Sequence, residues 1–294
     1  MSVTGSGNRG KLILAFLAVY LVWGSTYLAI RFGVESWPPF MMSGLRFMVA
    51  GLLLLAWSKY RGEPLPKAGE WLNSLLVGAL LITVGNGIVS YAERSVASAV
   101  AALGVAVVPL FTLVFSQIWG HRNTRLEWLG ILLGLGGILL LNLGHNLRAD
   151  PLGGALLLLA ACGWAFGSVW SKHLQLPKGT MGMAAQMFMG GAASMTVSVV
   201  LGERLEAMPT LKSWLAILYL TTFGSLVAFS AYLYLWHRVR PAAATSYAYV
   251  NPAVAMVLGI WLANERMGLN EWLALAVIVG AVVLIGFPRR EITI

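Results

Sequence analysis

Ten long stretches of mainly apolar residues run through this chain, separated by short polar breaks. A helix needs about 20 such residues to cross a bilayer. The stretches lie near 11–31, 39–58, 71–91, 97–118, 125–143, 152–172, 180–201, 212–236, 242–262 and 270–287. In lipid, only helices and closed barrels satisfy every backbone polar group internally. Because 59% of the residues are hydrophobic and only 11% are charged, we expect an all-α integral membrane protein.

One motif occurs twice, once in each half of the chain. Residues 98–142 and 243–286 each carry a proline within an apolar stretch, Pro109 and Pro252, which stand 143 positions apart. A Glu-Trp-Leu sequence follows in each half, and its two copies stand 144 positions apart. Two related halves in a membrane chain are typical of secondary transporters, in which repeats rock around a shared site.

The basic residues predict how the chain lies in the membrane. The breaks on one predicted side, together with both termini, hold thirteen Lys and Arg residues, and the other side holds six. This bias places both termini in the cytoplasm and also accounts for the net charge of +9 without nucleic acid. Five spans per half is an odd number, so we expect inverted five-helix repeats over residues 1–147 and 148–294. The first apolar stretch is long enough to be an uncleaved helix.

Several segments, taken in order, carry a family resemblance. They are WGSTYLAIR at 23–31, LRFMVAGLLLL at 45–55, the stretch centred on Pro109, and YAYVNPAVAMVLGIWLANERMG at 247–268. Together they resemble the EamA family of the drug/metabolite transporter superfamily. The resemblance implies ten transmembrane helices as two inverted five-helix repeats around a central cavity. It also implies transport of small metabolites, closest to bacterial inner-membrane exporters of amino acids, including aromatic ones. One departure is His121, which stands where the family pattern has glutamate.

Polar and aromatic side chains inside the predicted spans are the candidate substrate-binding residues, because lipid does not satisfy them. Span three carries a polar stripe at helical spacing, and one tryptophan lies deep in the first span of each half. Hydrogen bonding between helices, core packing and a proline kink near Asn251 stay open as alternatives. The candidates are Trp23, Tyr27, Asn86, Ser90, Tyr91, Trp164, Ser168, Ser225, Tyr247 and Asn251.

Arg46 is the one charge well inside a predicted span. A charge near the middle of a membrane helix costs about 3 kcal/mol on insertion scales, so Arg46 should be paired or reach the interface. Glu35 and Glu93, on the same predicted side, are the expected partners. We interpret Arg46 as a structural clamp rather than a substrate ligand.

These patterns predict a secondary transporter that exports small amphipathic metabolites, most of all apolar or aromatic amino acids, by alternating access. Because spans one and six lack an acidic residue, facilitated transport is expected, with proton-coupled drug efflux or a channel-like protein as alternatives. No catalytic constellation is visible, so neither an enzyme, a cofactor nor a metal is expected. The expected partners are a small-molecule substrate and the inner-membrane bilayer, and a homo-oligomer stays open.

Overall fold

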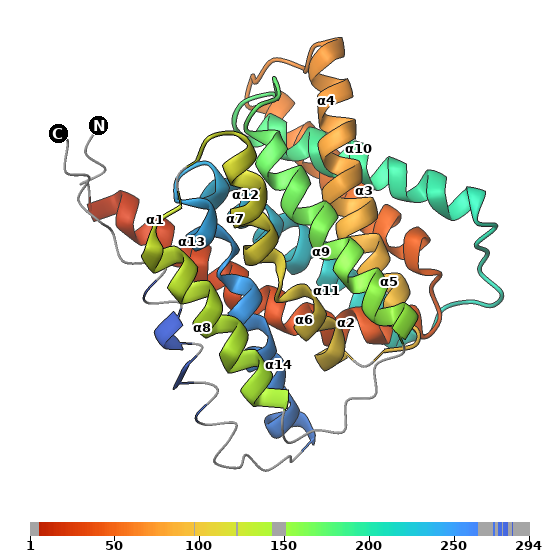
Figure 1. Ribbon diagram of the computed structural model, residues 1–294. Coiled ribbons are helices and arrows are strands. Elements are labelled where there is room, and N and C mark those ends of the chain that lie inside the picture. The colour runs from red at the N-terminus through yellow and green to blue at the C-terminus, as the bar shows by residue number, and fades with distance from the viewer. Residues whose placement is uncertain are drawn as a thin grey trace.

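The computed structural model describes residues 6–96, 98–121, 123–142 and 151–263, with residues 273, 276, 277, 279–281 and 284 beyond them. All regular secondary structure in these residues is helical, and Figure 1 shows the helices as one bundle. Within these described ranges, seven helical stretches are long and apolar enough to cross a membrane, by length and composition. The fold is therefore an all-helical membrane bundle.

Span one consists of α1 (Ser6–Leu17), η1 (Ala18–Val22) and α2 (Trp23–Val34), and span two is α3 (Pro39–Tyr60). Span three consists of α4 (Ala68–Gly78), η2 (Ala79–Gly87) and α5 (Ile88–Ala92). Span four consists of α6 (Ser98–Val105) and α7 (Val108–Ile118). Spans five, six and seven are α8 (Arg125–Asn142), α9 (Pro151–Ser171) and α10 (Gly179–Val200). Span eight consists of α11 (Leu211–Tyr219), η3 (Leu220–Phe229) and α12 (Ser230–Trp236), and span nine consists of α13 (Pro241–Thr245) and α14 (Tyr247–Ala263). Of the tenth predicted stretch, 270–287, only residues 273, 276, 277, 279–281 and 284 are among the described residues.

Prolines and glycines mark where the membrane helices begin and end. Pro39 and Pro241 are the first residues of α3 and α13, where a missing N–H costs no helical hydrogen bond. Gly62 and Gly202 follow the ends of α3 and α10 with φ angles of 80° and 69°. A side chain at these positions would strain the backbone, so the glycines end both helices sharply.

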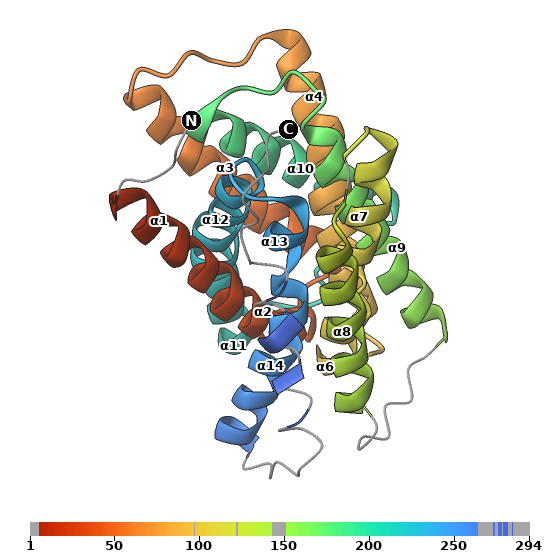
Figure 2. The ribbon, with the colours of Figure 1, turned by 60° about the vertical axis from the view of Figure 1, so that its left-hand side comes forward.

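The most extensive helix pair joins α3 to α10, and Figure 2 shows these two helices from a second side. Their backbones come close because small residues face each other. A Cβ atom on Gly191 would lie 2.6 Å from the backbone nitrogen of Met48. A Cβ atom on Gly44 would lie 2.9 Å from the backbone nitrogen of Met195. This contact joins the first half of the chain to the second.

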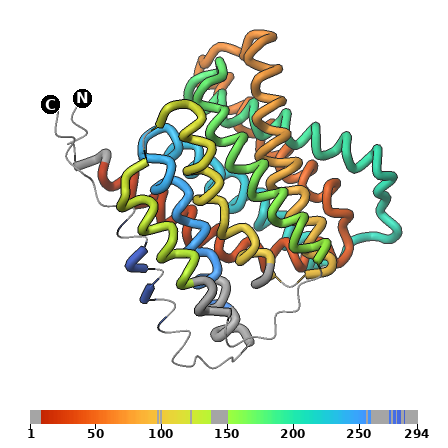
Figure 3. Tube along the Cα trace, viewed as in Figure 1, coloured from red at the N-terminus to blue at the C-terminus, as the bar shows by residue number. Residues whose placement is uncertain are grey.

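Three of the spans contain π-helical segments, in which N–H groups bond to the carbonyl five residues back. In span three, η2 continues α4 and leads into α5 along one trace, as Figure 3 shows. In span eight, η3 lies in the same way between α11 and α12. The segments cover 9 and 10 residues, whereas π-helices elsewhere are mostly single turns found at functional sites.

The two motif prolines occupy different places in their helices. Span four breaks between α6 and α7, and Pro109 stands at the second position of α7. In the second half the break falls at Ser246, and Pro252 lies inside α14. The helical structure is therefore interrupted directly before α7, which carries Pro109, and six residues before Pro252, and Ala106 and Ser246 at these interruptions are buried.

Candidate functional site

A small cavity of about 50 Å³ lies inside the bundle. By the measure that one water needs ~10–15 Å³, it has room for a few waters. Its walls come from α2, α3, η2, α5, α6, α9 and α14. The lining residues are Trp23, Thr26, Tyr27, Ile30, Arg46, Gly85, Asn86, Val89, Val105, Ala160, Ala161, Trp164, Tyr247 and Asn251. Both halves of the chain contribute to it.

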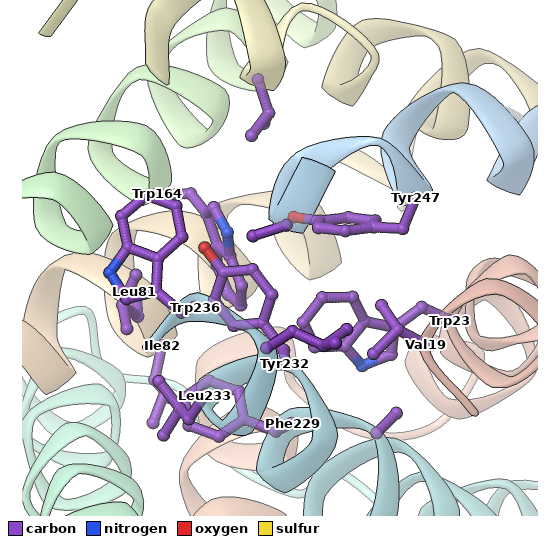
Figure 4. Packing of buried hydrophobic residues seen from close by; sticks show 14 of the residues in the cluster. Val19, Trp23, Leu81, Ile82, Trp164, Phe229, Tyr232, Leu233, Trp236 and Tyr247 are labelled. Atoms are coloured by element: carbon purple, nitrogen blue, oxygen red, sulfur yellow. The ribbon is translucent and has the colours of Figure 1, made fainter. Parts of the chain in front are cut away.

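Aromatic rings pack together at one end of the cavity. The Trp23 ring lies at the centre, with centroids 5.4 Å from Trp164, 5.2 Å from Tyr232 and 4.7 Å from Tyr247. Figure 4 shows these rings converging from different helices, and Trp236 stacks on Tyr232 with 6.0 Å between the ring centroids. Tilted and edge-on ring pairs at such distances stabilise a packed core. These four rings form an aromatic layer at the wall of the cavity, which Trp23, Trp164 and Tyr247 line.

Several buried polar atoms around the cavity have no hydrogen-bond partner among the described residues. They are Nε1 of Trp164, both amide atoms of Asn251, and Nε and Nη1 of Arg46. The Tyr27 hydroxyl lies near the Asn251 side chain, but the amide atoms do not meet full hydrogen-bond geometry. Leaving a buried polar group unsatisfied costs about 1–3 kcal/mol. Polar groups of this kind, gathered around one cavity, fit a site that receives a polar ligand or water.

Arg46 does not form the ion pair that the sequence suggested with Glu35. Glu35 instead binds Lys212, with 2.9 Å between the charged atoms. Arg46 donates from Nη2 to the Asn86 side-chain oxygen at 3.0 Å, and its guanidinium lies 4.5 Å from the centroid of the Phe47 ring. The expectation about Glu35 was wrong because Glu35 lies on the exposed end of α2, within reach of a lysine.

Glu93 lies directly after α5 and is fully buried. Neither of its carboxylate oxygens has a hydrogen-bond partner among the described residues. Its backbone carbonyl accepts a hydrogen bond from Arg31, and its charge interacts with those of Arg31 and Arg46. The structure therefore places two cations and one carboxylate near the same end of the cavity.

Six of the ten predicted site residues line the cavity: Trp23, Tyr27, Asn86, Trp164, Tyr247 and Asn251. The other four do not. Ser168 is bonded to the Tyr232 hydroxyl at 2.6 Å, and Ser90 donates to the backbone carbonyl of Asn86 at 3.0 Å. Ser225 is fully buried in η3, and Tyr91 is 38% exposed and packs on Phe40.

The placement of Ser90 and Tyr91 has a physical reason. The predicted stripe assumed 3.6 residues per turn throughout span three, but η2 lies within it. Wider π turns change which side chains share a face. Thr83 accordingly bonds the Gly190 carbonyl of α10 at 3.2 Å, while Asn86 turns toward the cavity.

Two elements contribute differently from what the candidate residues suggested. Span two reaches the cavity through Arg46, which we had interpreted as a clamp, and span eight, which holds the candidate Ser225, is not among the lining residues. Thr26 and Ile30 line the cavity as well, one and two turns beyond Trp23 on α2. The spacing of three and four residues along α2 was the signal that could have found them.

Two larger hollows of about 530 and 620 Å³ lie beyond the aromatic layer, at the predicted cytoplasmic end. Lys172 lines both, and its ammonium group lies 4.4 Å from the centroid of the Trp236 ring. Burial lowers the pKa of Lys172 to about 8. Burial also lowers the pKa of His121, and nearby Arg240 adds to that effect. Tyr232 and Trp236 therefore stand between the small cavity and this basic end.

An all-helical membrane bundle around a cavity that combines aromatic rings with unpaired polar groups is the architecture of a membrane transporter. The model of the EamA-like transporter family matches the chain twice, over residues 10–143 and 151–287. The chain belongs to the EamA-like transporter family, and the sequence-based family prediction is confirmed.

Relatives of known name agree with this assignment. The chain is 52% identical over 284 residues to the uncharacterized inner membrane transporter YedA of Escherichia coli, covering 95% of this chain and 93% of YedA. It is 25% identical to the uncharacterized transporter YoaV of Bacillus subtilis, covering 93% of this chain and 94% of YoaV. A solved crystal structure shares the fold with a TM-score of 0.74 at 21% identity, covering 94% of this chain and 97% of that one.

Proposed function

We propose that this transporter exports small amphipathic metabolites, most of all amino acids with apolar or aromatic side chains. The observation that carries the proposal is the cavity, where rings of Trp23 and Trp164 adjoin the unpaired polar atoms of Asn251 and Arg46. Rings suit an apolar side chain, and the amide and guanidinium suit the charged groups of a zwitterion. One inner-membrane relative is half identical in sequence, which supports the same location for this chain.

We propose ten transmembrane helices in two inverted repeats, residues 1–147 and 148–294, with both termini in the cytoplasm. Two family matches, one in each half, support the division. The π segments support it too, since η2 moved along by 143 residues overlaps η3. The excess of basic residues on the side of the termini supports the orientation.

Alternating access would move substrate between the two sides of the aromatic layer. At about 50 Å³ the cavity accommodates an amino-acid head group but not a large side chain, so a substrate requires a wider state. Trp23 and Tyr247 touch Tyr232, which belongs to α12, so a shift of span eight would open the layer. The larger hollows on its far side would then become continuous with the cavity.

We propose facilitated transport, because the described lining of the cavity contains one guanidinium and no carboxylate. A second candidate is proton-coupled efflux, which the buried carboxylate of Glu93 favours. A carboxyl group without partners, next to the site but outside its lining, has the chemistry of a proton carrier. The two candidates differ in whether a proton gradient drives accumulation.

Flux in proteoliposomes tests both candidates. Labelled L-leucine and L-phenylalanine should exchange across the membrane faster with the protein than in empty vesicles, and an imposed pH gradient should not drive accumulation. Asn251→Ala should lower this flux, whereas Trp57→Ala should not, because Trp57 is 55% exposed and far from the cavity lining. Absence of amino-acid flux would overturn the substrate class. Proton-driven accumulation that is lost in Glu93→Gln would establish the second candidate instead.

A further inference from the structure

The guanidinium of Arg46 is a charged group in the cavity wall that is only partly satisfied by hydrogen bonds. The side chain is 2% exposed and forms part of the cavity wall. Asn86 takes one hydrogen bond from Nη2, while Nε and Nη1 have no partner in the described part of the chain. The single N–H of Nε and the two of Nη1 are therefore available as donors. Phe47 covers one face of the guanidinium, so further partners must approach at its edge.

The charges around Arg46 do not balance. Arg31 and Arg46 carry two positive charges, and the Glu93 carboxyl near them can offset at most one of these charges. Arg31 is bonded to the backbone carbonyl of Glu93. Within the described residues, the ion pairs closer than 4.0 Å involve other residues, Lys212 with Glu35 and Arg240 with Glu127. One positive charge is left over beside a buried cavity, where an unpaired charge is costly.

A ligand that supplies one negative charge and accepts hydrogen bonds would offset the excess positive charge and satisfy the free N–H groups of Arg46. A carboxylate does this, because its two oxygens accept several N–H groups and its charge matches the excess. A phosphate would bring more charge than the excess and would call for additional cations. We propose that Arg46 binds the carboxylate of the transported molecule, and that Asn86 positions the guanidinium for it.

This assignment rests on the proposed transport function and narrows its substrates to molecules that bear a carboxylate. The remaining polar groups complete the arrangement. The Asn251 amide oxygen and the Tyr27 hydroxyl stand on the cavity wall as acceptors for an ammonium group. Trp23 and Trp164 contribute the apolar surface that faces the rest of the molecule. The arrangement defines Arg46 as a determinant of specificity, which changes its role from the clamp expected from sequence.

Propionate is a suitable probe, because it is about as small as the cavity and needs no transport to be detected. Thermal unfolding of the purified protein is followed in sodium propionate, in sodium chloride at equal ionic strength, and in propionamide, its neutral analogue. We expect propionate to raise the melting temperature of the unaltered protein. At equal concentration, propionamide should raise it at least tenfold less. No preference for propionate over propionamide would overturn the proposal without any variant.

Variants then test whether the preference belongs to Arg46. Arg46→Gln should remove the propionate effect, Arg46→Lys should retain part of it, and Asn86→Ala should weaken it. Lys59→Met, which removes an exposed charge at the end of α3, should leave it unchanged. A propionate effect that persists in Arg46→Gln would overturn the proposal, and so would one lost in Lys59→Met.

Transport of two compounds that differ only in the carboxylate distinguishes the proposed role of Arg46 from the proposed export of amino acids. L-Phenylalanine and L-phenylalaninamide differ in the carboxylate alone, so the unaltered protein should carry the acid at least tenfold faster. If both are carried equally, the proposed export of amino acids stands and the role of Arg46 is wrong. If neither is carried but propionate binding depends on Arg46, the role of Arg46 stands and the proposed substrate class is wrong.

Discussion

At the scale of single residues, buried polar groups in this protein differ in whether they have partners. Ser168 is bonded to Tyr232 at 2.6 Å and holds α9 against α12. Asn251 is equally buried, but its amide makes no hydrogen bond of full geometry. A satisfied group contributes to folding, whereas an unsatisfied one lowers stability until a ligand or water binds it.

Alanine substitutions should therefore have opposite consequences at the two positions. Ser168→Ala should reduce the free energy of unfolding by about 1 kcal/mol, because a buried hydrogen bond is lost. Asn251→Ala should leave stability nearly unchanged but lower transport about tenfold, equivalent to about 1.4 kcal/mol of lost ligand interaction. Melting temperatures and proteoliposome flux measure the two effects. Loss of stability without loss of transport in Asn251→Ala would mean that Asn251 is a packing residue.

Lys172 should make stability depend on pH. Its pKa is about 8 in the folded protein because of burial, and 10.5 is the ordinary value expected in the unfolded chain. Between these values the unfolded state binds more protons, so the free energy of unfolding should rise as pH increases from about 8 to 10.5. Thermal unfolding at pH 7.5 and 9.5 measures this. The rise in stability between these two pH values should be smaller in Lys172→Met and unchanged in Lys59→Met. Equal rises in the unaltered protein and both variants would show that Lys172 does not cause the pH dependence.

Residues of the cavity wall could be predicted from sequence where a side chain is unusual for its depth. Trp23, Trp164 and Asn251 were singled out in this way and line the cavity, since large rings and amides are rare in the middle of a membrane helix. Arg46 was noticed for the same reason but assigned another role. Its role depends on which partners surround it, and pairings such as Glu35 with Lys212 form between residues far apart in the chain.

At the scale of helices, the contact between α3 and α10 depends on glycine. Gly191→Val should destabilise the protein by about 1–3 kcal/mol, because the added atoms overlap the backbone of α3 near Met48. Gly154→Val is a matched control in a membrane helix, since no atom lies within 4 Å of a Cβ atom there. Melting temperature after purification measures both. Equal stability of the two variants would show that α3 and α10 can separate without cost.

Helix positions were more predictable than helix faces. Nine predicted stretches coincide with helices, since apolar length alone determines where a chain crosses a membrane. The face of span three was predicted incorrectly around Ser90 and Tyr91, because η2 departs from 3.6 residues per turn. No residue type within Ala79–Gly87 is specific to a π-helix, so the face of span three could not be predicted correctly from one sequence.

At the scale of the whole molecule, the proposed orientation can be tested by labelling. In a background with Cys162→Ser, we expect Arg61→Cys to be protected from an impermeant thiol reagent applied to intact cells. Glu206→Cys should react rapidly, because it would lie outside. Both positions are exposed, so accessibility depends on the side of the membrane. The reverse pattern would place the termini outside.

The paired π segments also bear on the history of the chain. An i→i+5 turn accommodates a residue that an α-helix would exclude, so each π segment indicates extra residues within its span. Under the proposed repeats, η2 and η3 occupy equivalent stretches of the two halves. The simplest origin is one ancestral insertion that was copied when a single five-helix gene doubled. A present-day relative that descends from the undoubled ancestor, and assembles as a pair, should carry the same widened turns in its third helix.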